Sequence, residues 1–500
     1  MKKNNIILAL LLMLLPFVAG AQALKGSYFL ENSINGHKMN PAFAPRANYF
    51  QLVVLGNTGV GLNSNLNLST FLYPMDGKLG TFLHPSVSVD QFDRNLPEHL
   101  YFDTDLTTTL LSFGWFNKRK AFWNFTLDAN VMADIDLPSD LFMFMKKGPG
   151  ANGERYNIGN VNAYAMGNLR ASLGWSREIA KGFRAGVKVR AVLPVAYAGL
   201  NLEDVSLTAS AEKWRISTEG YLHTAMQGLS ISQHQDDGFN AGFDMDKFIA
   251  NKGLSGMGYS VDLGLQYTLE TGSIFDGLNI SAAVTDLGQI FYKSNSMSAF
   301  STSGSYEWEG LNDLVMTEEI DTDKIVDDVM DGLMGLINLS EKDIDGRFVR
   351  STMPKVYAGI EVPFLWRRMS VGLLYSARFS HSYARQELTA SYNLTPCRWF
   401  AVGLNYSFLN TRKSMGAILE FTPKVGPTFY LGCDYFPAEY IDAPILENML
   451  GEVPSLLKPV TDYLGVDSWP LMTNVNLNVN FGIAFNMGSK HVNPKKEKNK

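Results

Sequence analysis

Residues 123–135 read WNFTLDANVMADI, and apolar and polar side chains alternate along almost the whole stretch. Trp123 and Phe125 begin the apolar set, whereas Asn124 and Asp128 belong to the polar set. Successive side chains of a β-strand point to opposite faces, so this pattern predicts a strand with one apolar and one polar face. Strands of soluble proteins usually end after about five or six residues, and this stretch is roughly twice as long.

The same alternation recurs in residues 161–176, 183–195 and 475–485. A strand that crosses a membrane needs about 9–11 residues, and these stretches reach or exceed that length. The apolar face would contact lipid, and the polar face would line a lumen. The sequence therefore predicts a transmembrane β-barrel rather than a secreted sandwich or solenoid.

About fourteen such strands can be placed along the chain, and bacterial barrels have even strand numbers. They are expected near residues 49–67, 104–115, 121–135, 160–176, 182–196, 258–270, 278–286, 354–363, 369–379, 387–394, 399–409, 415–421, 428–436 and 473–487. Short connections alternate with long ones, as expected for periplasmic turns and extracellular loops. Residues 203–225 could add one more hairpin, which would preserve the parity. The predicted fold is all-β: an antiparallel up-and-down barrel over residues 48–489, with long loops, some of them helical, and an N-terminal plug.

The totals exclude several other classes of protein. Hydrophobic residues make up 46% of the chain, yet the mean hydropathy is −0.05, so apolar residues are mixed with polar ones rather than gathered into membrane-spanning helices. The net charge of −6 is small for a chain of 500 residues and does not indicate a nucleic-acid partner.

Residues 1–21 have the composition of a secretory signal peptide. Two lysines follow Met1, residues 6–18 are apolar, and small residues at positions 19–21 suit cleavage after Ala21. A membrane anchor is the alternative, but the apolar run is too short to span a bilayer and contains Pro16. An exported barrel is expected in the outer membrane of a Gram-negative cell.

Residues 22–47 precede the first strand and are too polar to lie in lipid. Prolines at positions 41 and 45 interrupt any regular strand or helix. Irregular backbone at membrane depth is tolerated only inside protein or a watery cavity, so this segment is predicted to fold into the lumen as a plug. The candidate plug residues are Tyr28, Asn40, Pro41, Ala42 and Phe43. The alternative is a disordered periplasmic leader.

Charged residues lie on the polar faces of neighbouring predicted strands. The candidate lumen-lining residues are Asp128, Asp134, Arg170, Arg184, Lys188 and Arg190. They could line a path for anionic solutes, or they could pair with one another as a structural ladder.

Three other segments do not follow the strand pattern. Residues 311–345 have apolar residues near helical spacing and are predicted to form an amphipathic helix in an outer loop. Residues 141–145, LFMFM, could hold an apolar ligand or pack against the barrel rim. Residues 490–500 form a basic tail that is expected in the periplasm.

No sequence motif indicates catalysis or metal binding. The chain has no H-E-x-x-H, no G-x-S-x-G and no P-loop, and its seven histidines do not have the spacing of metal ligands. No catalytic residue, metal site or cofactor is expected, and the chain is not expected to be an enzyme.

Short motifs resemble a known group of proteins. Residues 27–31 read SYFLE, residues 39–45 read MNPAFAP, and residues 283–288 read AVTDLG. Together they resemble an uncharacterised family of outer-membrane barrels related to FadL-type long-chain fatty-acid transporters and to the PorV-type shuttle of a gliding-associated secretion system. The resemblance implies a fourteen-strand barrel and uptake of apolar solutes, and it transfers no ligand-binding residue.

The sequence thus predicts an outer-membrane barrel for the passive passage of a small hydrophobic or amphipathic compound. The alternative is a non-transporting barrel for binding or secretion, whose loops engage a protein partner. The expected partners are outer-membrane lipid, the barrel-assembly machinery and, in the first case, a small hydrophobic ligand. No nucleic-acid partner is expected.

Overall fold

The computed structural model describes most of the mature chain. The described residues are 24–30, 33–52, 57–75, 78–147, 154–209, 214–234, 238–270, 276–308, 340–342, 348–365, 368–380, 383–409, 412–437, 440–444, 468–472 and 476–488. The predicted signal peptide and basic tail lie outside them. So does the helix predicted at 311–345, apart from β15 (Ser340–Lys342), which is a strand.

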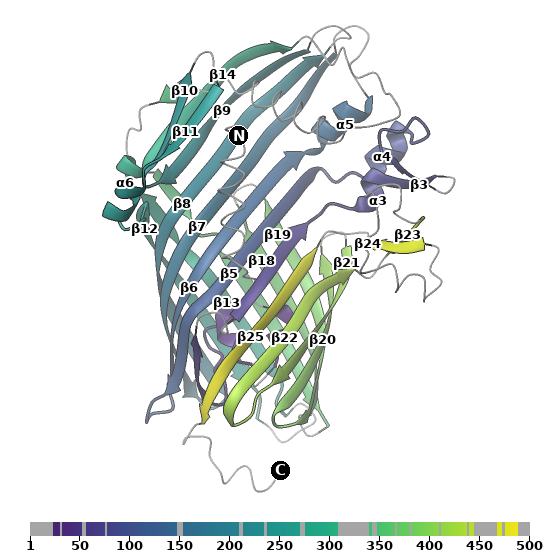
Figure 1. Ribbon diagram of the computed structural model, residues 1–500. Helices are drawn as coiled ribbons and strands as arrows, with labels where there is room; N and C mark the ends of the chain where they lie inside the picture. Colours follow the sequence, from purple (N-terminus) through teal and green to yellow (C-terminus); the bar gives the residue numbers. More distant parts are fainter. Residues whose placement is uncertain are drawn as a thin grey trace, which may run out of the picture.

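One antiparallel sheet closes on itself as a barrel of fourteen strands, which confirms the predicted fold (Figure 1). Around the wall these are β1 with β2 (Asn48–Leu52, Asn57–Ser64), β5 (His99–Phe116), β6 (Phe122–Pro138), β7 (Glu154–Ala180), β8 (Phe183–Ala209), β12 (Gly256–Thr268), β13 (Asn279–Tyr292), β16 with β17 (Phe348–Ser351, Lys355–Phe364), β18 (Met369–Phe379), β19 (Ala384–Cys397), β20 (Phe400–Leu409), β21 (Arg412–Phe421), β22 (Val425–Pro437) and β25 (Leu477–Gly488). The ring closes where β25 pairs with both β1 and β2, which therefore act as one strand.

Short turns join the strands at one end of the barrel, drawn at the bottom of Figure 1 and here called the lower end. In the turn between β5 and β6, the Asn117 Oδ1 atom accepts hydrogen bonds from the backbone N–H groups of Arg119 and Ala121, at 2.9 and 3.0 Å. Such side-chain to backbone bonds replace the strand ladder in a tight turn. In the turn between β7 and β8, Gly182 has a φ of 72°, a conformation that glycine adopts without strain.

Two strands are much longer than the sequence predicted. β7 and β8 each have 27 residues. The lower part of β8 pairs with β12 and its upper part with β9 (Trp214–Met226), and the change of partner occurs around Pro194. Proline has no N–H group for the ladder, and its carbonyl accepts a hydrogen bond from the Ser255 N–H at 2.8 Å. β9 in turn pairs with β14 (Met297–Trp308), so the hairpin considered within 203–225 is part of an upper tier of the wall.

The other elements occupy the connections between the long strands. They are α3 (Leu68–Phe71), β3 (Leu72–Met75), β4 (Lys78–Thr81), α4 (Val89–Asn95), α5 (Ser139–Lys147), β10 (Leu229–His234), β11 (Gly238–Phe243), α6 (Met245–Ala250), η3 (Ser294–Ser296), β23 (Tyr440–Pro444) and β24 (Ser468–Met472). α5 contains the LFMFM segment, and its Phe144 packs with Val205 and Leu207 of β8. This segment therefore packs against the rim of the barrel. No helix in the described ranges is long and apolar enough to cross a membrane.

The two faces of the wall differ as the alternation predicts. On β8, Val189 is 51% exposed on the outer face, whereas the neighbouring Lys188 is 2% exposed and faces the lumen. On β25, Phe481 and Phe485 are exposed, whereas Asn480 is buried. An apolar outer face and a polar inner face are what a strand between lipid and a lumen requires.

Candidate functional site

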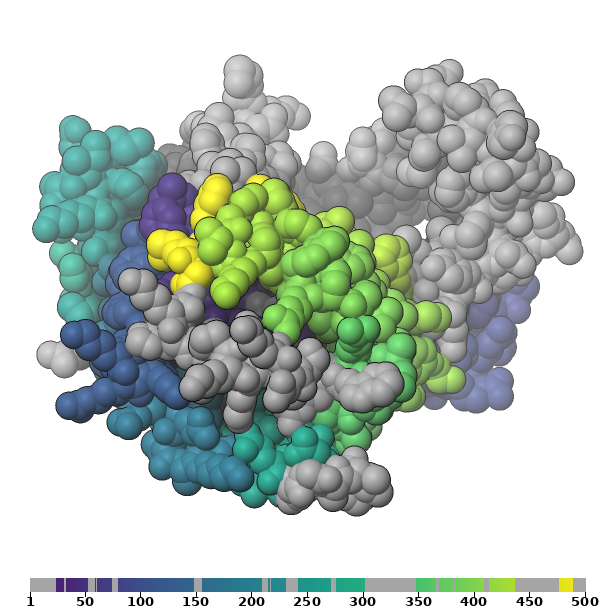
Figure 2. All heavy atoms as spheres, turned by 90° about the horizontal axis from the view of Figure 1, so that it is seen from below, coloured from purple at the N-terminus to yellow at the C-terminus, as the bar shows by residue number. Residues whose placement is uncertain are grey.

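The described N-terminal residues, 24–30 and 33–47, here called the plug segment, lie inside the lumen. They include two short helices, η2 (Lys25–Ser27) and α2 (Gly36–Met39), and most of their described side chains are buried. Seen from the lower end, purple atoms of this segment show inside the ring of strands (Figure 2). The structure thus places all five candidate plug residues in the lumen, against strands from several sides of the barrel.

The middle of the plug segment contacts the wall at two glycines. A Cβ atom on Gly186 of β8 would lie 2.1 Å from the Pro41 carbonyl oxygen, and one on Gly264 of β12 would lie 2.1 Å from the Asn40 Oδ1 atom. Only glycine permits so close an approach. The Asn40 Nδ2 group donates a hydrogen bond to the Leu265 carbonyl at 3.2 Å, and the Asn40 Oδ1 atom accepts one from the Ala42 N–H at 2.9 Å.

Aromatic side chains hold a second contact between the plug segment and the wall. The rings of Tyr28 and Phe43 meet edge to face with centroids 5.0 Å apart, and Tyr28 stacks on Tyr357 of β17 at 6.2 Å. The Tyr28 hydroxyl is hydrogen-bonded to the Ser281 hydroxyl at 3.1 Å. A buried tyrosine needs such a polar partner for its hydroxyl.

The start of the plug segment is held to the barrel wall by charged side chains. The Lys25 N–H donates to Asp434 at 2.8 Å, and the Lys25 ammonium forms an ion pair with Glu387 of β19. The Tyr435 hydroxyl also donates to Glu387, at 2.9 Å. A buried carboxylate is stable when its lone pairs are satisfied in this way.

Around the plug segment the wall carries a band of ionised side chains, here called the charged layer. Its members are Asp103, Asp105, Asp128, Arg170, Lys188, Arg190, Asp262, Asp286, Lys355, Arg378, Arg385 and Glu387. Arg190 binds Asp262 at 2.8 Å and also pairs with Asp286, and Lys355 lies 3.7 Å from Asp286. Asp103 forms ion pairs with two arginines, Arg378 at 2.9 Å and Arg385 at 3.5 Å. A cavity of about 110 Å³ remains between these side chains and the plug segment.

The structure separates the six candidate lumen residues into three groups. Asp128, Arg170, Lys188 and Arg190 line the cavity together. Asp134 lies apart from that cavity and accepts hydrogen bonds from the Ser380 and Tyr383 hydroxyls, at 3.2 and 2.7 Å.

Arg184 lies towards the lower end of the barrel, away from the charged layer. It donates to the Ser176 hydroxyl at 3.0 Å and lines a second cavity of about 520 Å³ between the end of the plug segment and the lower turns.

Sequence reasoning missed most of the other members of the charged layer. Asp103, Asp105 and Arg378 lie in predicted strands or next to them, in phase with inward-facing residues, and this phase could have identified them. No local pattern, however, indicates that Lys25 and Lys38 of the plug segment reach the same layer.

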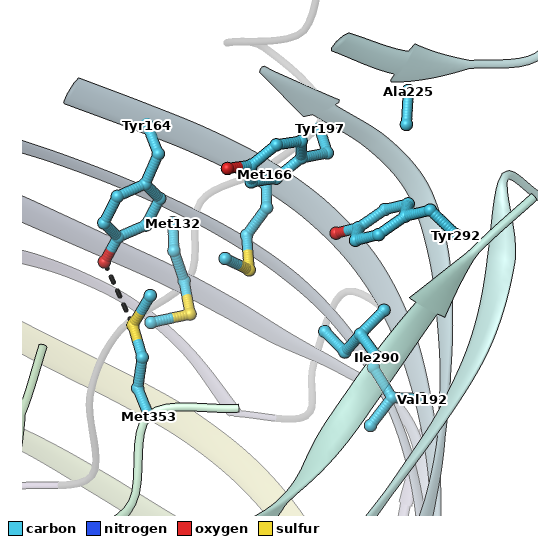
Figure 3. Close-up of a cluster of buried hydrophobic side chains, with 9 residues drawn as sticks. All are labelled: Met132, Tyr164, Met166, Val192, Tyr197, Ala225, Ile290, Tyr292 and Met353. Atoms are coloured by element: carbon cyan, nitrogen blue, oxygen red, sulfur yellow. Dashed lines mark hydrogen bonds between the residues drawn. The ribbon is translucent and has the colours of Figure 1, made fainter. Parts of the chain in front are cut away.

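A buried cluster on the same inner wall is apolar, and it is here called the apolar cluster. Its members are Met132, Tyr164, Met166, Val192, Tyr197, Ala225, Ile290, Tyr292 and Met353. Figure 3 shows the three methionine side chains and the tyrosine rings of this cluster gathered together, on strands β6, β7, β8 and β13 and the segment before β17. The Tyr164 hydroxyl donates to the Met353 sulfur at 3.0 Å. Polar side chains are the rule on the inner face of a barrel. Other apolar residues of the inner wall, such as Leu374 and Ile418, pack against the plug segment, whereas this cluster contains no residue of that segment.

Several solved transporter structures are similar to the chain. The Pseudomonas putida toluene transporter TodX is 12% identical, with 91% of this chain and 94% of that chain covered and a TM-score of 0.39. The Ralstonia pickettii toluene transporter TbuX is 9% identical, with coverages of 94% and 96% and a TM-score of 0.37. A Pseudomonas aeruginosa FadL homologue is 12% identical, with coverages of 94% and 98% and a TM-score of 0.36.

A search of curated protein sequences finds no match. A family model described as a family of unknown function, DUF5723, matches residues 41–434. This match begins within the plug segment and covers most of the barrel wall. The chain therefore belongs to the family of unknown function DUF5723.

Proposed function

We propose that the chain is an outer-membrane barrel that takes up a small apolar or amphipathic compound and lets it pass through the lumen. The observation that carries this proposal is the apolar cluster on the inner wall. Sites for small ligands are mostly apolar, with a few polar groups that fix orientation. The apolar cluster, with the Tyr197 and Tyr292 hydroxyls beside its methionines, matches that composition.

The side chains of the cluster can move aside to admit a ligand. Methionine is flexible and polarizable, so its side chain adapts to different apolar shapes. Polar groups are also present, since the Tyr197 hydroxyl accepts a hydrogen bond from the Arg350 Nε group at 2.8 Å. The Tyr292 hydroxyl is buried and has no hydrogen-bond partner among the described residues, so it is available to a ligand.

Passage also requires a movement of the plug segment. The cavity left in the charged layer has a volume of about 110 Å³, and the plug segment occupies the lumen beside it. A compound that reaches the apolar cluster must therefore displace part of this segment to continue. Its hydrogen bonds to the wall at Asn40 and Lys25 are the contacts that such a movement would break.

The close fit of the plug segment favours a second function, in which the barrel binds its ligand or a partner without transporting anything. The two functions predict different conductances after removal of the plug segment. Deletion of residues 24–47 should raise the conductance of a planar bilayer if the segment gates a path. Unchanged conductance would favour binding without passage.

Ligand binding is tested with purified barrel and an apolar fluorescent probe, 1-N-phenylnaphthylamine. Met166→Gln keeps the length of the side chain but places an amide in the apolar cluster, and it should weaken probe binding about fivefold or more, since a buried amide without partners costs roughly 1–3 kcal/mol. Met145→Gln is the matched control, because Met145 is 47% exposed on α5. Heat-modifiable gel migration verifies that both variants are folded. Probe binding that is absent, or equal in both variants, would exclude the cluster as the site.

A further inference from the structure

We infer that the cavity in the charged layer binds a small anion, such as phosphate or acetate, between the plug segment and the barrel wall. Three cations would hold it: Lys38 of the plug segment, Arg170 of β7 and Lys188 of β8. All three line the cavity. None of the three cations is a member of the apolar cluster, and the proposal does not depend on what the barrel transports.

The other cations of the charged layer already have carboxylate partners. Arg190 is paired with Asp262 and Asp286, and Lys355 with Asp105 and Asp286. The remaining pairs are Arg378 and Arg385 with Asp103, and Lys25 with Glu387. In this part of the lumen, pairing is therefore the general rule for buried charge.

Lys38, Arg170 and Lys188 depart from this rule, since none of them forms an ion pair within the described part of the chain. The Lys38 ammonium donates to the Thr109 hydroxyl at 3.2 Å, and the Arg170 guanidinium donates to the Thr107 hydroxyl at 3.3 Å. The Lys188 ammonium donates to the His37 carbonyl at 2.8 Å. All these acceptors are uncharged. The Arg170 Nε group is buried and has no acceptor among the described residues.

Nearby carboxylates offset part of this charge, since Asp262 attracts Lys188, and Asp286 attracts Arg170 and Lys188. Asp128 lies directly opposite Arg170 in the pairing of β6 with β7, and it lines the same cavity. It accepts a hydrogen bond from Thr109 at 2.9 Å and forms no ion pair with a described residue. Counted together, the charged layer, Lys25 and Lys38 hold eight cations and six carboxylates, and Asp434 beside Lys25 is a seventh, so an excess of positive charge remains.

Such an excess is costly in a buried site. An unpaired charge loses the hydration that it has in water, and an arginine cannot escape this cost by losing its proton. Lys38 and Arg170 repel each other, as do Lys188 and Lys38, while Asp128 attracts Lys38 and Asp262 attracts Lys188. A bound anion removes the excess and accepts the free N–H groups, and for this reason the site favours one.

The cavity limits the size and chemistry of this anion. The cavity, with a volume of about 110 Å³, accommodates a small oxyanion. The Thr126 and Ser172 hydroxyls also line the cavity and can donate to anion oxygens. Because Lys38 belongs to the plug segment and the other two cations to the wall, the anion stabilises the plug segment in place.

The experiment compares the thermal unfolding of the full mature chain in detergent in sodium phosphate, acetate or gluconate at matched ionic strength. Phosphate and acetate should raise the unfolding midpoint in proportion to the logarithm of their concentration, because they bind only the folded state. Gluconate is the bulkier reference anion and should raise the midpoint less. Crystals grown with bromide should show anomalous scattering near Lys38 and Arg170. Equal midpoints in all three salts and no bromide peak would overturn the proposal.

Two variants remove the charge excess in opposite ways. Lys38→Met deletes a cation, whereas Thr109→Asp adds a carboxylate beside it, and each should abolish most of the anion dependence. The second keeps the proposal testable if the first does not fold. Lys181→Met is the matched control, since Lys181 lies on the lower turn and pairs with Glu270 outside the cavity. Anion dependence that persists in both cavity variants, or that is lost equally in the control, would contradict the proposal.

Discussion

The charged layer and the apolar cluster lie near each other on the same inner wall and share several strands, but they meet the plug segment differently. On β7, Arg170 belongs to the charged layer and Met166, four residues earlier, to the apolar cluster. The plug segment contributes Lys25 and Lys38 to the lining of the charged cavity, whereas no member of the apolar cluster comes from it. The plug segment therefore fills part of the lumen at the charged layer and contributes no side chain to the apolar cluster.

The two regions also differ in how well they tolerate substitutions. A buried charge requires a partner at a defined distance, so the loss of one group leaves another without compensation. Apolar side chains tolerate exchange as long as the volume is conserved. We therefore expect mutations in the charged layer to have larger effects on stability than conservative mutations in the apolar cluster.

The largest effect is expected for Asp103→Asn. This change leaves Arg378 and Arg385 without their shared carboxylate and should lower the free energy of unfolding by about 3–5 kcal/mol. Urea unfolding of the refolded barrel in detergent measures it. Glu270→Gln is the control, because its ion pair with Lys181 is exposed and contributes at most about 1 kcal/mol. A similarly small loss of unfolding free energy in both variants would show that buried charges in the charged layer do not need their partners for stability.

The second prediction extends the comparison to the outer face of the wall. Val187→Arg places a charge on the lipid side of β8, next to Lys188 on the lumen side, and should cost about 2–4 kcal/mol or prevent assembly. The measurement is the heat-modifiable fraction after refolding into lipid bilayers. Val425→Arg is matched in chemistry but lies at the start of β22 near the lower turns, where the cost should be about 0–1 kcal/mol. A Val187→Arg barrel that assembles as well as the control would show that this face does not meet lipid.

Much of the wall could be predicted from the sequence because a single physical rule determines it. The period of two fixes which residues meet lipid, and it fixes the faces on β6, β7, β8 and β25 correctly. The upper parts of β7 and β8 could not be predicted this way, since beyond Pro194 strand β8 pairs with β9, and that pairing is not visible in a local pattern.

The candidate site could be predicted only in part. Asp128, Arg170, Lys188 and Arg190 follow from the alternation, because they lie in phase on long strands. Their partners Asp262, Asp286 and Lys355 lie far along the chain, so only the closure of the barrel brings them together. The apolar cluster escaped notice because Met132, Tyr164 and Met166 occupy positions in the polar phase of the alternation, and because a register shift after Pro194 turns Tyr197 inward.

A smaller effect is expected for Met132→Leu in the apolar cluster. The two side chains have similar volumes, so the free energy of unfolding should fall by less than about 1.5 kcal/mol. Binding of the apolar probe should change by only a few fold, since the surface stays apolar. Urea unfolding and probe titration on the same preparation measure both effects. A loss as large as that of Asp103→Asn would contradict the contrast between the two regions.

The smallest effect on stability is expected for Tyr292→Phe, and it tests how the apolar cluster recognises a ligand. The Tyr292 hydroxyl has no partner among the described residues, so its removal should leave the free energy of unfolding within about 0.5 kcal/mol of the original or raise it slightly. Tyr197→Phe is the matched change, because the Tyr197 hydroxyl accepts a hydrogen bond from Arg350, and its loss should cost about 1.5–3 kcal/mol. If the Tyr292 hydroxyl orients an amphipathic ligand, Tyr292→Phe should weaken binding of 1-naphthol but not of naphthalene. If Tyr292→Phe changes the affinity for neither compound, the cluster selects its ligand by apolar contact alone.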